Sequence, residues 1–242
     1  MGSDFRAPDL SEGDPTVVLP GDLILEYDPE KTQDRIFLGP GLRWQDKTIT
    51  ATKCGLLRKT PKKIYFIDSQ QKRYVPEKRD FVVGIILKKR GDFYMIDIGA
   101  SMAATISYLS FENASKKTRT ELDVGDLIYG KLIVANKHMD PELVCIDSYD
   151  RAMGMGRLPD GGILFTVPLH VARLLIKPDN PFLHNISKKI TYTIVVGLNG
   201  RVWVKTAREG EMVAVMNAIL LLEVMSMEEA NKKVLKVLES FI

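Results

Sequence analysis

Between Phe81 and Asp147, apolar residues fall into short runs rich in β-branched side chains, and Gly, Asp, Asn or Ser separates one run from the next. This pattern is typical of β-strands joined by turns. The five runs predict strands at Phe81 to Leu87, Phe93 to Ile98, Ala104 to Ile106, Leu127 to Val134 and Leu143 to Ile146. Five short strands match the antiparallel barrel of the OB kind. We therefore expect a five-stranded OB barrel over residues 77–149.

The segment before the barrel also reads as short strands and turns, and it predicts a small all-β domain over residues 15–76. Strands are expected at Val17 to Leu19, Leu23 to Tyr27, Ile36 to Leu38, Lys47 to Cys54, Gly55 to Arg58 and Ile64 to Ile67. Residues 1–14 are expected to be a disordered tail. A Gly-Asp pair precedes an apolar strand at Gly21 and again at Gly125. We interpret this as shared turn chemistry, in which Gly permits a positive φ and Asp caps the turn.

Helical spacing appears only beyond Tyr149, and it predicts an α+β domain over residues 150–242. A strand is expected from Ile163 to Thr166, and two helices follow, beginning near Pro168 and Pro181. A third helix carries the apolar stripe of Met212, Val215, Met216, Ile219 and Leu222. A fourth begins at a capping box of Ser226 and Glu229 and directs Ala230, Val234, Leu238 and Phe241 inward. The order of strand, two helices, hairpin and closing helices is that of a KH-like domain.

The hairpin of this domain joins Tyr192 to Val196 and Arg201 to Lys205 through Gly197-Leu198-Asn199-Gly200. Asn-Gly between alternating strands predicts a type I′ turn with positive φ at both central positions. In ordinary KH domains a Gly-x-x-Gly loop clamps the nucleic acid backbone. Here the motif lies between strands, and Leu198 stands where a phosphate clamp needs a donor. We therefore interpret these four residues as structural, with Asn199 buried and bonded to backbone in its own turn or across to the OB domain.

Composition and charge indicate that a polyanion such as RNA is a candidate ligand. The chain has 242 residues, 45% of them hydrophobic, which suffices for two or three domains. Its net charge is only +3, but Ala51 to Arg90 holds twelve basic and three acidic residues. Such a block attracts polyanions, although it can also be only a solvated face. The basic residues on or beside the barrel are the candidate RNA contacts: Lys88, Lys89 and Arg90, with Lys116, Lys117 and Arg119 in the interruption from Ser107 to Gly125.

Several functional classes lack their signatures. No apolar run approaches the roughly 20 residues of a membrane span, and the amino terminus resembles no signal peptide, so we expect a nucleocytoplasmic protein. Cys54 and Cys145 are expected to be two core side chains. Walker and His-Glu-x-x-His motifs are absent, and the three His residues are scattered, so we expect no enzyme, cofactor or metal. Carboxylates converging in space could still form a metal-dependent nuclease, which a sequence does not exclude.

A specific resemblance to a known family rests on five sequence segments and on the order of the three domains. The segments are Val17 to Asp22, Asp68 to Pro76, Ser107 to Phe111, Val124 to Gly130 and Gly197 to Lys205. On these the chain resembles the cap subunits of the eukaryotic RNA exosome, which combine an all-β domain, an S1-type OB domain and a KH domain. The resemblance spans about residues 17 to 242.

The resemblance implies a non-catalytic subunit that sits with two other caps on a ring of six RNase PH-like subunits. It implies that the chain stabilises the ring and guides RNA toward a separate 3′-to-5′ exoribonuclease, in the nucleus, the nucleolus and the cytoplasm. A free-standing OB/KH RNA-binding factor, as in translation, is the alternative.

Overall fold

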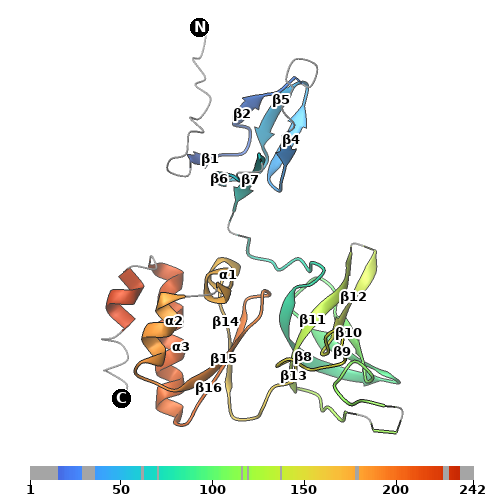
Figure 1. The fold of residues 1–242 in the computed structure, drawn as a ribbon. Coiled ribbons are helices and arrows are strands. Elements are labelled where there is room, and N and C mark those ends of the chain that lie inside the picture. Colours follow the sequence, from blue (N-terminus) through green and yellow to red (C-terminus); the bar gives the residue numbers. More distant parts are fainter. Residues whose placement is uncertain are drawn as a thin grey trace. The chain divides into compact units, whose positions relative to one another are not determined.

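The computed structural model describes residues 16–28, 36–60, 63–69, 71–115, 117–118, 120–136, 138–177, 180–225 and 229–234. Most of its elements are strands (Figure 1). The chain divides into two units, Met1–Gln70 and Gln71–Ile242, and the second contains both the barrel and the α+β domain. In the described part of the chain, no helix is long and apolar enough to cross a membrane.

The first unit is a small all-β domain made of two sheets. One sheet has the order β1 (Thr16–Val18), β6 (Gly55–Lys59), β7 (Ile64–Asp68), β3 (Phe37–Leu38). The other has the order β2 (Leu23–Glu26), β5 (Thr48–Ala51), β4 (Leu42–Gln45). The predicted strand from Lys47 to Cys54 is confined to β5, and β4 was not predicted. Both sheets contribute to one core, formed by Val18, Ile24, Ile49, Ala51, Leu57 and Ile67.

The predicted OB barrel is confirmed. Its strands are β8 (Phe81–Arg90), β9 (Phe93–Asp97), β10 (Ala104–Ser107), β11 (Leu127–Asn136) and β12 (Met139–Val144). They follow the order β12-β10-β9-β8-β11, and pairing between β11 and β12 closes the barrel. A short strand, β13 (Gly156–Arg157), adds to β11. Alternate residues of each strand fill the interior, and Val82, Ile96, Ile98, Ala104, Ile128 and Leu132 are fully buried there.

The α+β domain has the expected KH-like order. Its elements are β14 (Ile163–Thr166), α1 (Leu169–Ile176), α2 (Pro181–Ser187), β15 (Tyr192–Val196), β16 (Arg201–Thr206) and α3 (Glu209–Val224). Residues 229–234 are helical as well. The sheet order is β14-β16-β15. Pro168 precedes α1 as its N-cap, and the Asn180 side chain caps α2 by accepting a hydrogen bond from the Phe182 N–H. Ser226, Leu238 and Phe241 lie outside the described residues.

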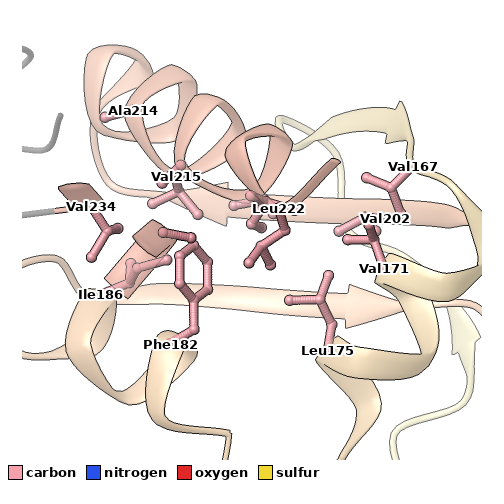
Figure 2. Close-up of a cluster of buried hydrophobic side chains, with 14 of the residues drawn as sticks. Val167, Val171, Leu175, Phe182, Ile186, Val202, Ala214, Val215, Leu222 and Val234 are labelled. Carbon is pink, nitrogen blue, oxygen red and sulfur yellow. The ribbon is translucent and has the colours of Figure 1, made fainter. Parts of the chain in front are cut away.

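The core of this domain lies between its helices and one face of its sheet. Figure 2 shows Phe182 and Ile186 of α2 and Leu175 of α1 facing Val215 and Leu222 of α3 across this core. The apolar stripe predicted for α3 supplies Met212, Val215, Ile219 and Leu222, which are all buried. Ala230 and Val234, predicted to face inward, are also buried in it.

The other face of the same sheet packs against the barrel. Trp203 of β16 is 1% exposed and lies in a cluster with Val83 of β8 and Leu158, which follows β13. Leu164 of β14 and Val195 of β15 pack against this cluster. The barrel and the KH-like domain therefore share a small apolar interface, to which the KH sheet contributes residues on the face opposite its own core.

Candidate nucleic-acid interface

Two of the predicted cations lie on the outside of the barrel at the β8–β9 hairpin. Lys88 pairs with Met95 and Arg90 with Phe93, across a bulge that shifts the register after Ile86. Tyr94 and Ile96, the alternate residues of β9, are buried inside, so Phe93 and Met95 lie on the outer side. Lys88 and Arg90 are exposed, and Phe93 is 52% exposed. We call these four residues, Lys88, Arg90, Phe93 and Met95, the hairpin face.

The hairpin face combines the two kinds of group that single-stranded nucleic acid needs. Arg90 and Lys88 supply positive charge for phosphates, and Phe93 supplies an aromatic surface for a base. The cations were expected to belong partly to flanking loops, but β8 continues through Arg90 and includes them. A strand fixes the spacing of these side chains more firmly than a loop would.

Lys89 lies on the opposite side of the strand and approaches the long loop after β10. Its Nζ lies 5.6 Å from the centre of the Tyr94 ring. The Tyr94 hydroxyl donates a hydrogen bond of 2.8 Å to the Thr120 carbonyl oxygen. Lys89 and Thr120 of the loop therefore both contact Tyr94.

The loop itself carries both signs of charge. Lys117 is exposed in a turn that Ser115 and Thr118 close with hydrogen bonds of 2.9 and 3.0 Å. Lys116 and Arg119 lie outside the described residues. Glu112 and Glu121 are also exposed in this loop, so its field is weaker than the basic residues alone suggest. The hairpin face is the more clearly cationic part of the site.

The Gly197–Gly200 motif connects the KH-like domain to the barrel, as predicted for Asn199. The Asn199 Oδ1 accepts a hydrogen bond from the Val83 N–H at 3.3 Å. Its Nδ2 donates to the Val83 carbonyl at 2.8 Å and to the Ile98 carbonyl at 2.9 Å. Asn199 is 8% exposed. One amide side chain thus bonds to the backbone of β8 and to the residue after β9.

The type I′ turn predicted for this hairpin is wrong. Among the four residues only Gly200 has a positive φ, of 79°. The Gly200 N–H donates to the Gly197 carbonyl at 3.0 Å, and the Gly197 N–H donates to the Arg201 carbonyl at 2.8 Å. This is a longer hairpin loop, in which a turn precedes one left-handed residue. Leu198 is drawn into the barrel interface, where its N–H donates to the Phe81 carbonyl.

An ion pair beside Asn199 was not predicted. The Arg201 guanidinium donates to both the carbonyl and the carboxylate of Asp97. Burial alone would raise the pKa of the Asp97 carboxyl, but the hydrogen bond from the Gly99 N–H and the charge of Arg201 hold that pKa below its usual value. Because the pair joins residues 104 positions apart, no local pattern indicates it.

The described residues contain no cluster of three or more His, Cys, Asp or Glu side chains that could hold a metal ion. Cys145 is buried as expected, and burial raises the pKa of its thiol to about 12. The same expectation was wrong for Cys54, which is exposed because it lies in the connection between β5 and β6. His138 and His184 are exposed, and the Asp97 and Asp147 carboxylates bind backbone N–H groups.

Comparisons with known proteins identify all three domains in order. Residues 16–70 match the family model "Mammalian exosome complex component RRP40, N-terminal", residues 74–156 match "Exosome complex component RRP40, S1 domain", and residues 162–210 match "KH domain".

The curated relatives agree with these models. The chain is 41% identical to exosome complex component RRP40 of Bos taurus, over 93% of this chain and 90% of the relative. It is 41% identical to the Drosophila melanogaster protein of the same name, over 90% and 93%. A crystal structure of a protein proposed to be an exosome complex RNA-binding protein covers 69% of this chain and 98% of its own, with a TM-score of 0.57 and 21% identity. At 21% identity, this match shows a similarity of fold alone.

Proposed function

The chain belongs to the family of exosome complex component RRP40, and from this premise we propose that it is a non-catalytic, RNA-binding cap subunit of the RNA exosome. In this role it stabilises a ring of RNase PH-like subunits beside two other caps and guides RNA to a 3′-to-5′ exoribonuclease. The observation that carries the proposal is the match of both RRP40-specific domain models in their proper order. Its location would be the nucleus and nucleolus, and also the cytoplasm.

Two features support a role in RNA contact. The hairpin face presents two cations and an exposed aromatic ring on an OB barrel, the fold that binds single strands through such groups. Lys89 and Lys117 extend the positive charge toward the loop at the end of the barrel. Contacts of this kind are made to phosphates and base faces, so binding should tolerate many sequences.

The assembly is tested on the native protein. Affinity purification from cell extract, followed by gel filtration and mass spectrometry, should recover the chain in a large complex with RNase PH-like subunits. A chain that elutes near its own mass, or with ribosomal particles, would contradict the proposal and favour the free-standing RNA-binding factor.

The RNA contact is tested by charge reversal on the purified chain. Replacing Lys88 and Arg90 with Glu should weaken binding to single-stranded RNA and flatten its salt dependence by roughly one unit of slope for each lost contact. The corresponding change at Lys116, Lys117 and Arg119 tests the loop. Lys232 and Lys233, which are exposed on the helix after α3, provide the control when replaced with Glu. Unchanged crosslinking in the first two variants would refute the site assignment.

The proposed absence of nuclease activity is tested directly on RNA. Homogeneous protein should leave 3′-labelled and 5′-labelled RNA intact, with or without Mg²⁺ and phosphate. Any processive shortening that persists through a second purification step would contradict the proposal.

A further inference from the structure

An exposed tyrosine lies on the loop that leaves the barrel after β12, residues 147–151, here called the Tyr149 loop. Tyr149 is 75% exposed, and the Arg151 guanidinium lies 5.1 Å from the centre of its ring. An arginine in this position can interact with one face of the ring. Because three quarters of the residue remains in water, much of the ring surface is open to a flat ligand.

The Tyr149 loop is held in one conformation by Asp147. The Asp147 Oδ1 accepts hydrogen bonds from the Tyr149 N–H at 2.8 Å and from the Arg151 N–H at 2.9 Å. The Asp147 N–H donates to the Arg151 carbonyl at 2.8 Å, and Asp150 has a positive φ of 58°. The ring is therefore displayed by an ordered turn, and a ligand would bind with little cost for ordering the backbone.

The strand register places the Tyr149 loop at the same end of the barrel as the hairpin face. Ser107 of β10 pairs with Phe93, and Ile106 pairs in parallel with Leu143 of β12. Beyond these pairs, the Cys145 N–H donates to the Ser110 carbonyl at 2.9 Å. Since adjacent strands are about 4.8 Å apart and β11 pairs with both β8 and β12, these two strands lie about 10 Å apart across β11. An OB barrel commonly binds about 4–16 nucleotides, so one strand of RNA could span this distance.

We propose that Tyr149 stacks an unpaired base of the same single-stranded RNA that contacts the hairpin face, and that Arg151 contacts the adjacent phosphate. This inference rests on the proposed RNA-binding function and adds a second, separate contact to it. Asp147 is occupied by backbone N–H groups and Arg151, and so contributes little repulsion. Asp150 is exposed and opposes the binding of phosphate, which makes it a useful probe.

The ring is tested by fluorescence anisotropy of the full chain with labelled oligouridine, by comparing Tyr149→Leu with Tyr149→Phe. Loss of the ring should weaken binding by at least about fivefold, and Phe should retain affinity within about twofold. The salt slope of Tyr149→Leu should match that of the parent, because stacking releases no counterions. Trp44→Leu, which removes a 52% exposed ring from the first unit, is the matched control and should bind like the parent.

Asp150→Asn gives an independent readout, because removing the exposed acid should strengthen binding about twofold and steepen the salt slope. If Tyr149→Leu binds like the parent while the Lys88 and Arg90 reversals lose RNA, the inference is wrong and the proposed function stands. If Tyr149→Leu lowers recovery of protein partners but not RNA affinity, Tyr149 is a protein contact and the inference is also wrong. A parent chain that binds no oligouridine would overturn both.

Discussion

At the scale of single residues, Asn199 joins two domains by satisfying backbone groups that would otherwise be unpaired. Its three hydrogen bonds reach Val83 and Ile98 from a position that is 8% exposed. Buried polar groups cost far more when they lose their partner than they contribute when paired. The motif Gly197–Gly200 therefore acts through its amide side chain at the domain interface.

Asn199→Ala should lower the free energy of unfolding by about 1–3 kcal/mol, because the Val83 and Ile98 backbone groups lose their partners. Urea denaturation followed by circular dichroism measures the change. Asn185→Ala is the matched control, since the Asn185 side chain bonds to two other side chains, those of Asn231 at 3.4 Å and Lys188 at 3.3 Å, in a less buried place. Equal effects of the two substitutions would argue against a special role for Asn199.

The Asp97–Arg201 pair should make stability depend on pH. The folded-state pKa of Asp97 is depressed, so its contribution is present above the unfolded pKa of about 3.9 and is lost as the pH falls through the folded value. At pH 7, Asp97→Asn should lower the Tm by about 2–4 °C, as expected for about 1 kcal/mol in a unit of this size. We set the value this low because the Asp97 side chain is 40% exposed and water screens the pair.

The Tm difference between the parent and Asp97→Asn should shrink as the pH falls below about 4 and vanish once the pH lies below the folded pKa of Asp97. Thermal melts at a series of pH values measure it. Glu142→Gln, an exposed change on β12, is the control and should show no such trend. A difference that stays constant with pH would show that the Asp97 carboxylate is not the stabilising group.

At the scale of elements, turns were the part of the fold that sequence patterns predicted least well. The Gly-Asp turns were predicted correctly, since Gly21 and Gly125 have φ of 97° and 98° and each following Asp accepts an N–H from three residues earlier. The hairpin turn at Asp46–Lys47 was not predicted, and the turn type predicted for Gly197–Gly200 was wrong. Asp46 and Lys47 both have positive φ and join β4 to β5, although Lys is not a residue that favours this conformation.

The strands and helices were predictable because burial imposes a period on the sequence, as in the five strands of the barrel and the buried stripe of α3. Strand β4 was missed, because Leu42 is only partly buried, its other three residues are exposed, and the turn after it lacks a Gly or Asn signal. In the candidate site, charge indicated Lys88 and Arg90, but only the register shows that they face Phe93 and Met95. Contacts such as Arg201 with Asp97 depend on tertiary structure alone.

Gly200 and Gly125 allow the backbone strain of the hairpin loop to be separated from its close packing. Both have positive φ, but a Cβ at Gly200 would lie 2.5 Å from the Val167 carbonyl oxygen, whereas at Gly125 nothing lies within 4 Å. Gly125→Ala should therefore cost only the conformational strain of about 1 kcal/mol. Gly200→Ala should cost the same conformational strain and, in addition, the clash of its Cβ with the Val167 carbonyl oxygen. Gly200→Val should cost about 1–3 kcal/mol from conformational strain alone, to which the clash with Val167 adds.

Thermal melting of these variants provides the measurement, and RNA binding at low temperature should persist in all of them. A Gly200 variant that melts like the parent but loses RNA affinity would show that the loop grips nucleic acid, contrary to the structural interpretation. Equal destabilisation by Gly125→Ala and Gly200→Ala would show that packing against Val167 contributes nothing.

At the scale of the whole molecule, the barrel and the KH-like domain form one unit, and the all-β domain forms another. Within the second unit, Trp203 packs on Val83, Asn199 bonds to β8, and Arg201 pairs with Asp97. These three contacts join the outer face of the barrel to the back of the KH sheet. The hairpin face and the Tyr149 loop lie elsewhere on the barrel, so the interface leaves both of them accessible.

A chain that begins at Gln71 should fold on its own, because the second unit contains its own cores and the complete Asn199 contact. Its Tm should match the corresponding transition of the full chain within about 2 °C, and Asn199→Ala should lower the Tm equally in both. Differential scanning calorimetry of the full chain should resolve a separate transition for the first unit, which Asn199→Ala leaves unchanged. A truncated chain that melts many degrees lower, or a single transition shifted as a whole by Asn199→Ala, would show that the two units fold as one cooperative body.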